Sequence, residues 1–145
     1  LWNPCDALEP TRVAELFGTT FDRLTGTPQE PRCAFTPAAE GEPVVEVNYQ
    51  LYGGTLEDIV TQLGDPVGTS EILQPTVPGA SGARIIVDSD DDALAVTGLV
   101  RNGRLVQVVN TLDLTPYDRD TTVDAVRELM ADLASRAEES GLNLG

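Results

Sequence analysis

The sequence predicts an α+β domain in which three helices, N-terminal, middle and long C-terminal, pack against an antiparallel β-sheet of about 5 to 6 strands. Three observations lead to this fold class. Hydrophobic alternation typical of strands fills the middle of the chain, short turns separate these segments, and amphipathic helical patterns lie near both ends. The length of 145 residues fits one domain spanning residues 1–145.

The first helix is predicted over residues 9–17. Pro10 lies near its first helical position, where proline is favoured, and Gly18 follows as a stop signal. A short strand is expected over residues 33–35.

The clearest strand is predicted over residues 45–51, where apolar and polar side chains alternate strictly. Gly53 and Gly54 end this strand. The following residues, Thr55 to Asp58, have the capping-box pattern that begins a helix, and we expect this helix to end before Gly64.

A long connection rich in proline and glycine is expected over residues 65–82. Three strands are predicted after it, over residues 84–87, 93–100 and 105–111. Asn102 and Gly103 separate the last two strands, and both can adopt the positive φ angles that a tight hairpin turn requires.

The C-terminal helix is predicted over residues 121–138. Its apolar residues recur at helical spacing and form one stripe: Val123, Val126, Leu129, Met130, Leu133 and Ala137. We expect this stripe to pack on the sheet.

The chain is strongly acidic, with 24 Asp and Glu, nine Arg, no Lys, no His and a formal charge of −15. Such a surface repels phosphate backbones and anionic lipids, so we expect no nucleic-acid partner and no charge-driven membrane binding. The arginines are spread from Arg12 to Arg136, which predicts no basic patch. Gly53 and Gly54 precede a helix, but no basic residue follows them, so we interpret them as a strand exit rather than a phosphate cradle.

No catalytic constellation is evident, because the chain lacks histidine and Ser81 does not lie in a G-x-S-x-G elbow. We therefore expect a non-enzymatic protein without a cofactor. A hydrolase with two carboxylates roughly 5 to 9 Å apart in an open cleft is an alternative.

Asp88, Asp90 and Asp92 copy the opening of a calcium-binding loop. An EF-hand also needs Gly at its sixth position and Glu at its twelfth, and here these positions hold Ala93 and Leu99. We interpret this acidic cluster as a solvated turn between strands and predict no metal site, although the sequence alone leaves cation binding open.

The two cysteines, Cys5 and Cys33, predict one disulfide, the alternative being two reduced thiols in a cytosolic protein. Their spacing is not C-x-x-C and no His or Lys flanks them, so neither a redox nor a zinc site is expected. The chain begins at Leu1 without a basic, apolar leader, and we interpret it as the mature part of an exported protein.

Three segments carry a family resemblance: Asn-Pro-Cys-Asp-Ala-Leu-Glu-Pro of residues 3–10, Val-Ala-Glu-Leu of residues 13–16, and Pro-Arg-Cys-Ala-Phe of residues 31–35. Together they resemble small actinobacterial cell-envelope lipoproteins of unassigned function. The resemblance implies a disulfide between Cys5 and Cys33, a lipidated cysteine upstream of Leu1 and a membrane-tethered, extracytoplasmic location. It also implies an α/β/α arrangement similar to the PsbP-like fold, and it offers no catalytic residues. This chain departs from the family in its acidity and in its proline-bearing segment between Gly64 and Gly82.

These observations predict a non-enzymatic, exported cell-envelope lipoprotein domain that acts as an accessory or protein-binding module for an envelope protein. The expected surface is the sheet face or edge near Tyr52 together with the loop from Gly64 to Gly82, because loops on a rigid sheet commonly carry recognition. The alternative function is a carrier of a lipid or other apolar small molecule, held in a cavity between the sheet and the C-terminal helix.

Overall fold

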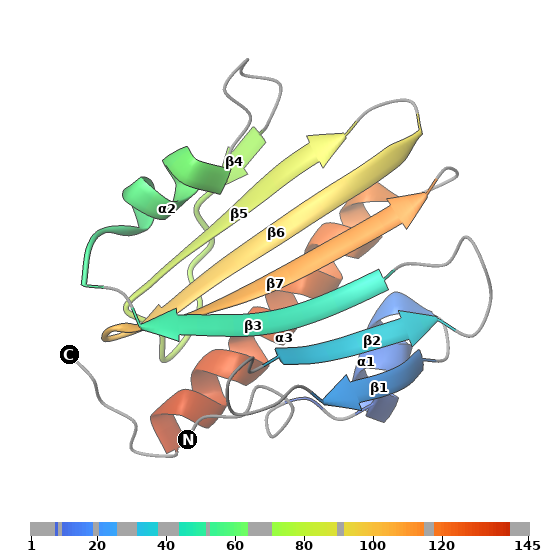
Figure 1. Cartoon of the computed structure of the whole chain (residues 1–145), viewed down its shortest axis with the longest axis horizontal. Helices are drawn as coiled ribbons and strands as arrows, with labels where there is room; N and C mark the ends of the chain where they lie inside the picture. Colours follow the sequence, from blue (N-terminus) through green and yellow to red (C-terminus); the bar gives the residue numbers. More distant parts are fainter. Residues whose placement is uncertain are drawn as a thin grey trace.

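The computed structural model of the chain describes residues 8, 10–18, 21–25, 32–37, 44–51, 53–63, 71–89, 92–114 and 118–139. The helices are α1 (Pro10–Phe17), α2 (Leu56–Leu63) and α3 (Arg119–Glu139). The strands are β1 (Phe21–Thr25), β2 (Arg32–Pro37), β3 (Val44–Leu51), β4 (Glu71–Leu73), β5 (Gly82–Ser89), β6 (Ala93–Asn102) and β7 (Leu105–Leu114) (Figure 1). The predicted α+β class, with its long C-terminal helix, is confirmed.

The seven described strands form one antiparallel sheet in the order β1-β2-β3-β7-β6-β5-β4. The strand count is higher than predicted because β1 was not expected and β4 lies within the segment expected to be a connection. Both are edge strands, which have a neighbour on one side only. β4 is three residues long and its central Ile72 is exposed, so no buried alternation marks it in the sequence.

The predicted hairpin between β6 and β7 is confirmed, but its turn lies one residue later than expected. Asn102 pairs with Leu105, so the two loop residues are Gly103 and Arg104. Gly103 has φ +60°, whereas no described residue other than glycine has a positive φ. The expectation of a positive φ at Asn102 was therefore wrong, and glycine at the first loop position is typical of a type II′ turn.

Helices α1 and α3 cover one face of the sheet (Figure 1). α3 packs tightly on β6 at Gly98, where a Cβ would lie 2.7 Å from both Met130 Sδ and Val126 Cγ1. Arg12 joins the two helices, because its guanidinium forms ion pairs with Glu128 at 3.0 Å and with Asp132 at 3.3 Å.

Helix α2 lies on the opposite face and covers only part of it. Its apolar residues pack on β5, β6 and β7 in a second core cluster: Leu56, Ile59, Val60, Ile86, Leu99, Val106 and Val108. Farther along the same face, Val44 and Leu112 pair across β3 and β7 and are 44% and 46% exposed. No helix in the described ranges is both long and apolar enough to cross a membrane.

Asp118 caps the start of α3, and its carboxylate accepts a hydrogen bond from the Thr121 backbone N–H at 3.2 Å. This bond, together with the Thr121 side chain, holds the pKa of Asp118 below its ordinary value of 3.8.

We predict that this cap makes a pH-dependent contribution to stability. Because the pKa of Asp118 is lower in the folded chain than in the unfolded chain, its contribution is present above pH 3.8 and disappears as the pH falls through the folded value. Asp118→Asn keeps a capping side chain that does not titrate, so its urea midpoint should fall less between pH 5 and pH 3 than that of the wild type. Parallel pH profiles for the two proteins would contradict this prediction.

Candidate functional site

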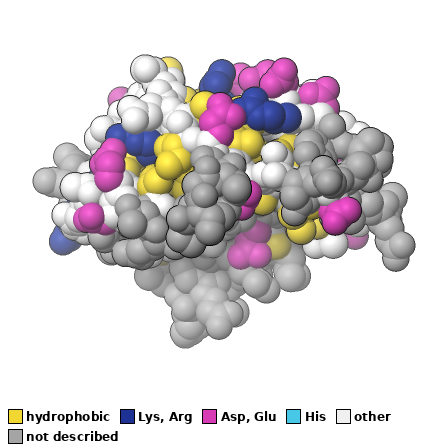
Figure 2. Space-filling view, turned by 90° about the horizontal axis from the view of Figure 1, so that it is seen from above, with side chains coloured by type: hydrophobic (Ala, Val, Ile, Leu, Met, Phe, Trp, Pro, Cys, Tyr) yellow, Lys and Arg dark blue, Asp and Glu magenta, His cyan; other side chains and the backbone are white. Residues whose placement is uncertain are grey.

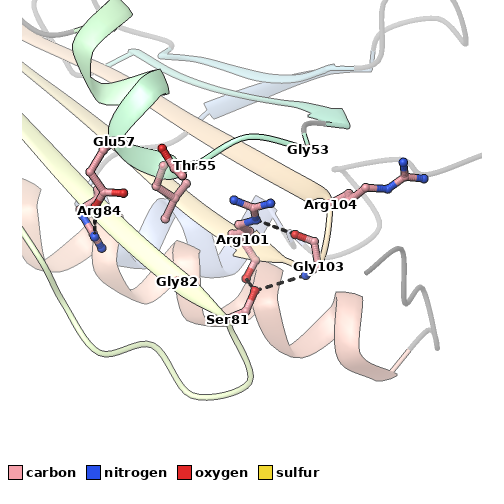
Figure 3. A pocket seen from close by; sticks show the side chains of 10 residues that line it. Gly53, Thr55, Glu57, Ser81, Gly82, Arg84, Arg101, Gly103 and Arg104 are labelled. Carbon is pink, nitrogen blue, oxygen red and sulfur yellow. Dashed lines mark hydrogen bonds and ion pairs between the residues drawn. The ribbon is translucent and has the colours of Figure 1, made fainter.

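A pocket of about 640 Å³ lies at the end of the sheet beside the start of α2 (Figure 3). Its lining residues come from three stretches of the chain: the turn into α2, the start of β5 and the β6–β7 hairpin. Its volume is within the range of about 300 to 1,000 Å³ that is common for ligand sites.

Hydrogen bonds fasten the β6–β7 hairpin to the start of β5. The backbone N–H and the hydroxyl of Ser81 both donate to the carbonyl oxygen of Arg101, at 2.7 and 3.1 Å. The same hydroxyl accepts from the Gly103 N–H at 3.2 Å. Ser81 therefore has a structural role in the pocket wall.

Arg101 connects this hairpin to the turn before α2. Its Nε–H donates to the Gly103 carbonyl at 2.6 Å, and its Nη1 donates to the Gly54 carbonyl. These bonds fix the half-buried guanidinium at the pocket wall, between segments that are far apart in the sequence (Figure 3).

Arg84 and Glu57 form an ion pair at one side of the pocket (Figure 3). The Arg84 guanidinium also donates to the Ala83 carbonyl at 2.7 Å, and the Arg84 side chain is 20% exposed, whereas that of Glu57 is 64% exposed. The backbone N–H of Glu57 and then the Arg84 guanidinium hold the pKa of the Glu57 carboxyl below its ordinary value of 4.5. Arg84 therefore contacts both the Ala83 carbonyl and the Glu57 carboxylate, whereas most of the Glu57 side chain is exposed to solvent.

The capping box predicted at the start of α2 is confirmed. The Asp58 N–H donates to Thr55 Oγ1 at 3.2 Å, and the Thr55 N–H donates to the Asp58 carboxylate at 3.4 Å. The side chains of Thr55 and Asp58 therefore accept hydrogen bonds from two backbone N–H groups at the start of α2.

The expectation that the chain has no basic patch was wrong. Of the nine arginines, Arg84, Arg101 and Arg104 line this one pocket, and Glu57 is its single acidic lining residue among the described residues. The cause is the strand register, which pairs Gly82 with Arg101 and so places Arg84 and Arg101 on the same sheet face. Figure 2 shows acidic side chains distributed over the side of the molecule that it presents, with arginine side chains next to several of them.

The structure brings together part of the surface predicted from the sequence. Gly53, Ser81 and Gly82 line the pocket, whereas Tyr52 and residues 64–70 lie outside the described residues. The other exposed part of the sheet face, around Val44 and Leu112, presents few large apolar side chains. Scattered apolar residues of this kind are common on protein surfaces, so the pocket is the stronger candidate site.

The remaining predicted site residues lie elsewhere. Cys33 is fully buried on β2, and the described residues include no free cysteine. Cys5 lies outside the described residues, so the bridge between the two stays a prediction. Asp88 and Asp92 are exposed near the β5–β6 turn, and Asp90 lies outside the described residues. In the described part of the chain, no group of three acidic, cysteine or histidine residues could hold a metal ion.

No protein-family model matches this chain, and no curated protein matches its sequence. The resemblance to envelope lipoproteins therefore stays a prediction, and the geometry of the pocket is the main support for a function.

Proposed function

We propose that this chain is the non-enzymatic domain of an exported cell-envelope lipoprotein and that it acts as a protein-binding module. The observation that carries the proposal is the convergence of Arg84, Arg101 and Arg104 on one pocket in a chain of formal charge −15. Arginine is enriched at the centres of protein interfaces, where its planar guanidinium group forms several directed hydrogen bonds.

The construction of the pocket supports this role. Arg84 and Arg101 are both held by backbone carbonyl groups, and Ser81 fastens the hairpin that carries Arg104. A partner that binds such fixed side chains loses less conformational entropy than one that must first order them. Arg104 is exposed on the hairpin turn, so it is accessible to a partner at the rim.

The described residues give less support to the carrier of an apolar molecule. That function needs a cavity between the sheet and α3, but at Gly98 the side chains of Met130 and Val126 already occupy the space that a single Cβ would need. The carrier stays the alternative, and it predicts a lipid rather than a protein as the bound molecule.

The proposal is tested by site-specific photo-cross-linking in cells that make the full-length protein. Benzoylphenylalanine replaces Gly53 in one variant, because Gly53 lines the pocket, is exposed and has no atom within 4 Å of the position that a Cβ would take, so all three pocket arginines are kept. In a control variant it replaces Arg127, which is exposed on α3. We expect a defined envelope protein, identified by mass spectrometry, to be cross-linked from position 53. A cross-linked lipid would support the carrier instead, and no adduct from position 53 would overturn the proposed site.

A further inference from the structure

We propose that the pocket receives an uncharged aromatic side chain of the partner protein, which stacks on the guanidinium groups of Arg84 and Arg101. The inference rests on the proposed protein-binding function and names the chemistry of its partner. It follows from the hydrogen bonds that orient the two guanidinium groups, from the glycine that lies opposite Arg101, and from the charge of the chain.

The guanidinium group of Arg101 is bonded along its edge. Its Nε–H donates to the Gly103 carbonyl at 2.6 Å, and its Nη1 donates to the Gly54 carbonyl. Guanidinium N–H groups lie in the plane of the group, so these bonds fix the orientation of the plane but do not use its two faces. A face can stack on an aromatic ring whether or not the N–H groups already have partners.

Arg84 is oriented in the same way. Its Nη1 donates to the Ala83 carbonyl at 2.7 Å, its Nη2 donates to Glu57, and its side chain is 20% exposed. The strand register makes Arg84 on β5 and Arg101 on β6 diagonal neighbours on one face of the sheet. Diagonal neighbours lie close enough for an aromatic ring to contact both side chains.

A glycine leaves space beside Arg101. Gly82 on β5 pairs with Arg101 on β6, so no side chain projects from β5 directly opposite Arg101 (Figure 3). Leu56 forms one border of this space, because a Cβ at Gly82 would lie 3.0 Å from Leu56 Cδ1. A ring in the pocket therefore meets an apolar side chain from α2 as well as guanidinium groups from the sheet, and the volume of about 640 Å³ is sufficient for one aromatic side chain.

The charge of the chain favours an uncharged ligand. An anion is repelled by the formal charge of −15, and it would have to replace groups that the arginines already bind. A cation meets the three arginines of the lining. An aromatic ring has no net charge, but its face is the negative part of a quadrupole and attracts a guanidinium group. Aromatic side chains are also enriched at protein interfaces.

The test is an NMR titration of the isotope-labelled, intact protein with an uncharged, capped peptide that has one tryptophan among glycine and serine residues. The matched control peptide has leucine in place of tryptophan. We expect the tryptophan peptide to move the signal of the Arg101 Nε–H upfield, because a proton above the face of a ring is shielded, and to shift the backbone signals of Gly82 and Gly103. The leucine peptide should bind at least about threefold more weakly. Added salt should have little effect, because the peptide is uncharged.

Arg84→Gln removes one stacking cation and should weaken binding of the tryptophan peptide about threefold. Arg127→Gln, an equal change of charge on α3, is the control and should have little effect. The comparison of the two peptides on the wild type does not depend on whether the Arg84 variant remains folded. Equal binding of the two peptides, or signals that shift only outside the pocket, would overturn the inference. If the tryptophan peptide does not bind while the cross-link from position 53 persists, this inference fails and the proposed function stands; if both are absent, the proposed function fails as well.

Discussion

Replacing Gly98 with valine is expected to destabilise the fold by about 3 kcal/mol. Gly98 lies on β6 beneath α3, where even a Cβ would be 2.7 Å from Met130 Sδ and from Val126 Cγ1. Met130 is flexible enough to move, but Val126 is β-branched and has one strongly preferred rotamer in a helix. The new side chain would therefore separate α3 from the sheet over the centre of the core.

Urea unfolding of the variant and the wild type measures this loss. The matched control is Gly53→Ala, because no atom lies within 4 Å of a Cβ at that position and its φ angle is not positive. We expect this control to leave stability unchanged or to raise it by a few tenths of a kcal/mol. Equal unfolding midpoints for the Gly98 variant and the wild type would show that α3 and β6 are not closely packed.

Breaking the predicted disulfide is expected to remove roughly 3.5 kcal/mol of stability, because a bridge between Cys5 and Cys33 closes a long loop in the unfolded chain. Cys5→Ala leaves the fully buried Cys33 in the core, so the loss of stability reports the missing bridge and not a change in the packing of Cys33 on β2. The measurement is the free energy of unfolding in urea, with and without a reductant.

Reductant should lower the stability of the wild type by about the amount that Cys5→Ala does. It should have no further effect on the variant, which serves as its own control. If reductant leaves the wild type unchanged, or if two thiols of freshly isolated, unfolded protein react with an alkylating reagent before reduction, the bridge and the extracytoplasmic location inferred from it are both wrong.

The central elements of the fold could be predicted because their local patterns agree with their burial. The strict alternation of residues 45–51 corresponds to β3, and the apolar stripe near the C-terminus corresponds to the buried face of α3. The capping box at Thr55 correctly located the start of α2. The edge strands β1 and β4 were missed because pairing with one neighbour, rather than a hydrophobic pattern, defines them.

The candidate site could be predicted only in part. Glycines and turn residues indicated where the chain changes direction, and Gly53, Ser81 and Gly82 do line the pocket. The convergence of arginines was missed because it depends on strand register. In the observed register Gly82 is opposite Arg101, and because side chains alternate along a strand, Arg84 lies on the same face as Arg101. The sequence alone does not specify which residues of β5 and β6 are opposite each other.

We propose centrally that a partner protein contacts the arginine-lined pocket rather than the exposed side of α3. The most direct measurement is the cross-linking yield from position 53, in the pocket, relative to position 127 on α3, with both variants at the same expression level. We expect the yield from position 53 to be at least several-fold higher and Arg84→Gln in the same chain to lower it. Equal yields from the two positions, or a yield from position 53 that does not respond to Arg84→Gln, would contradict this claim.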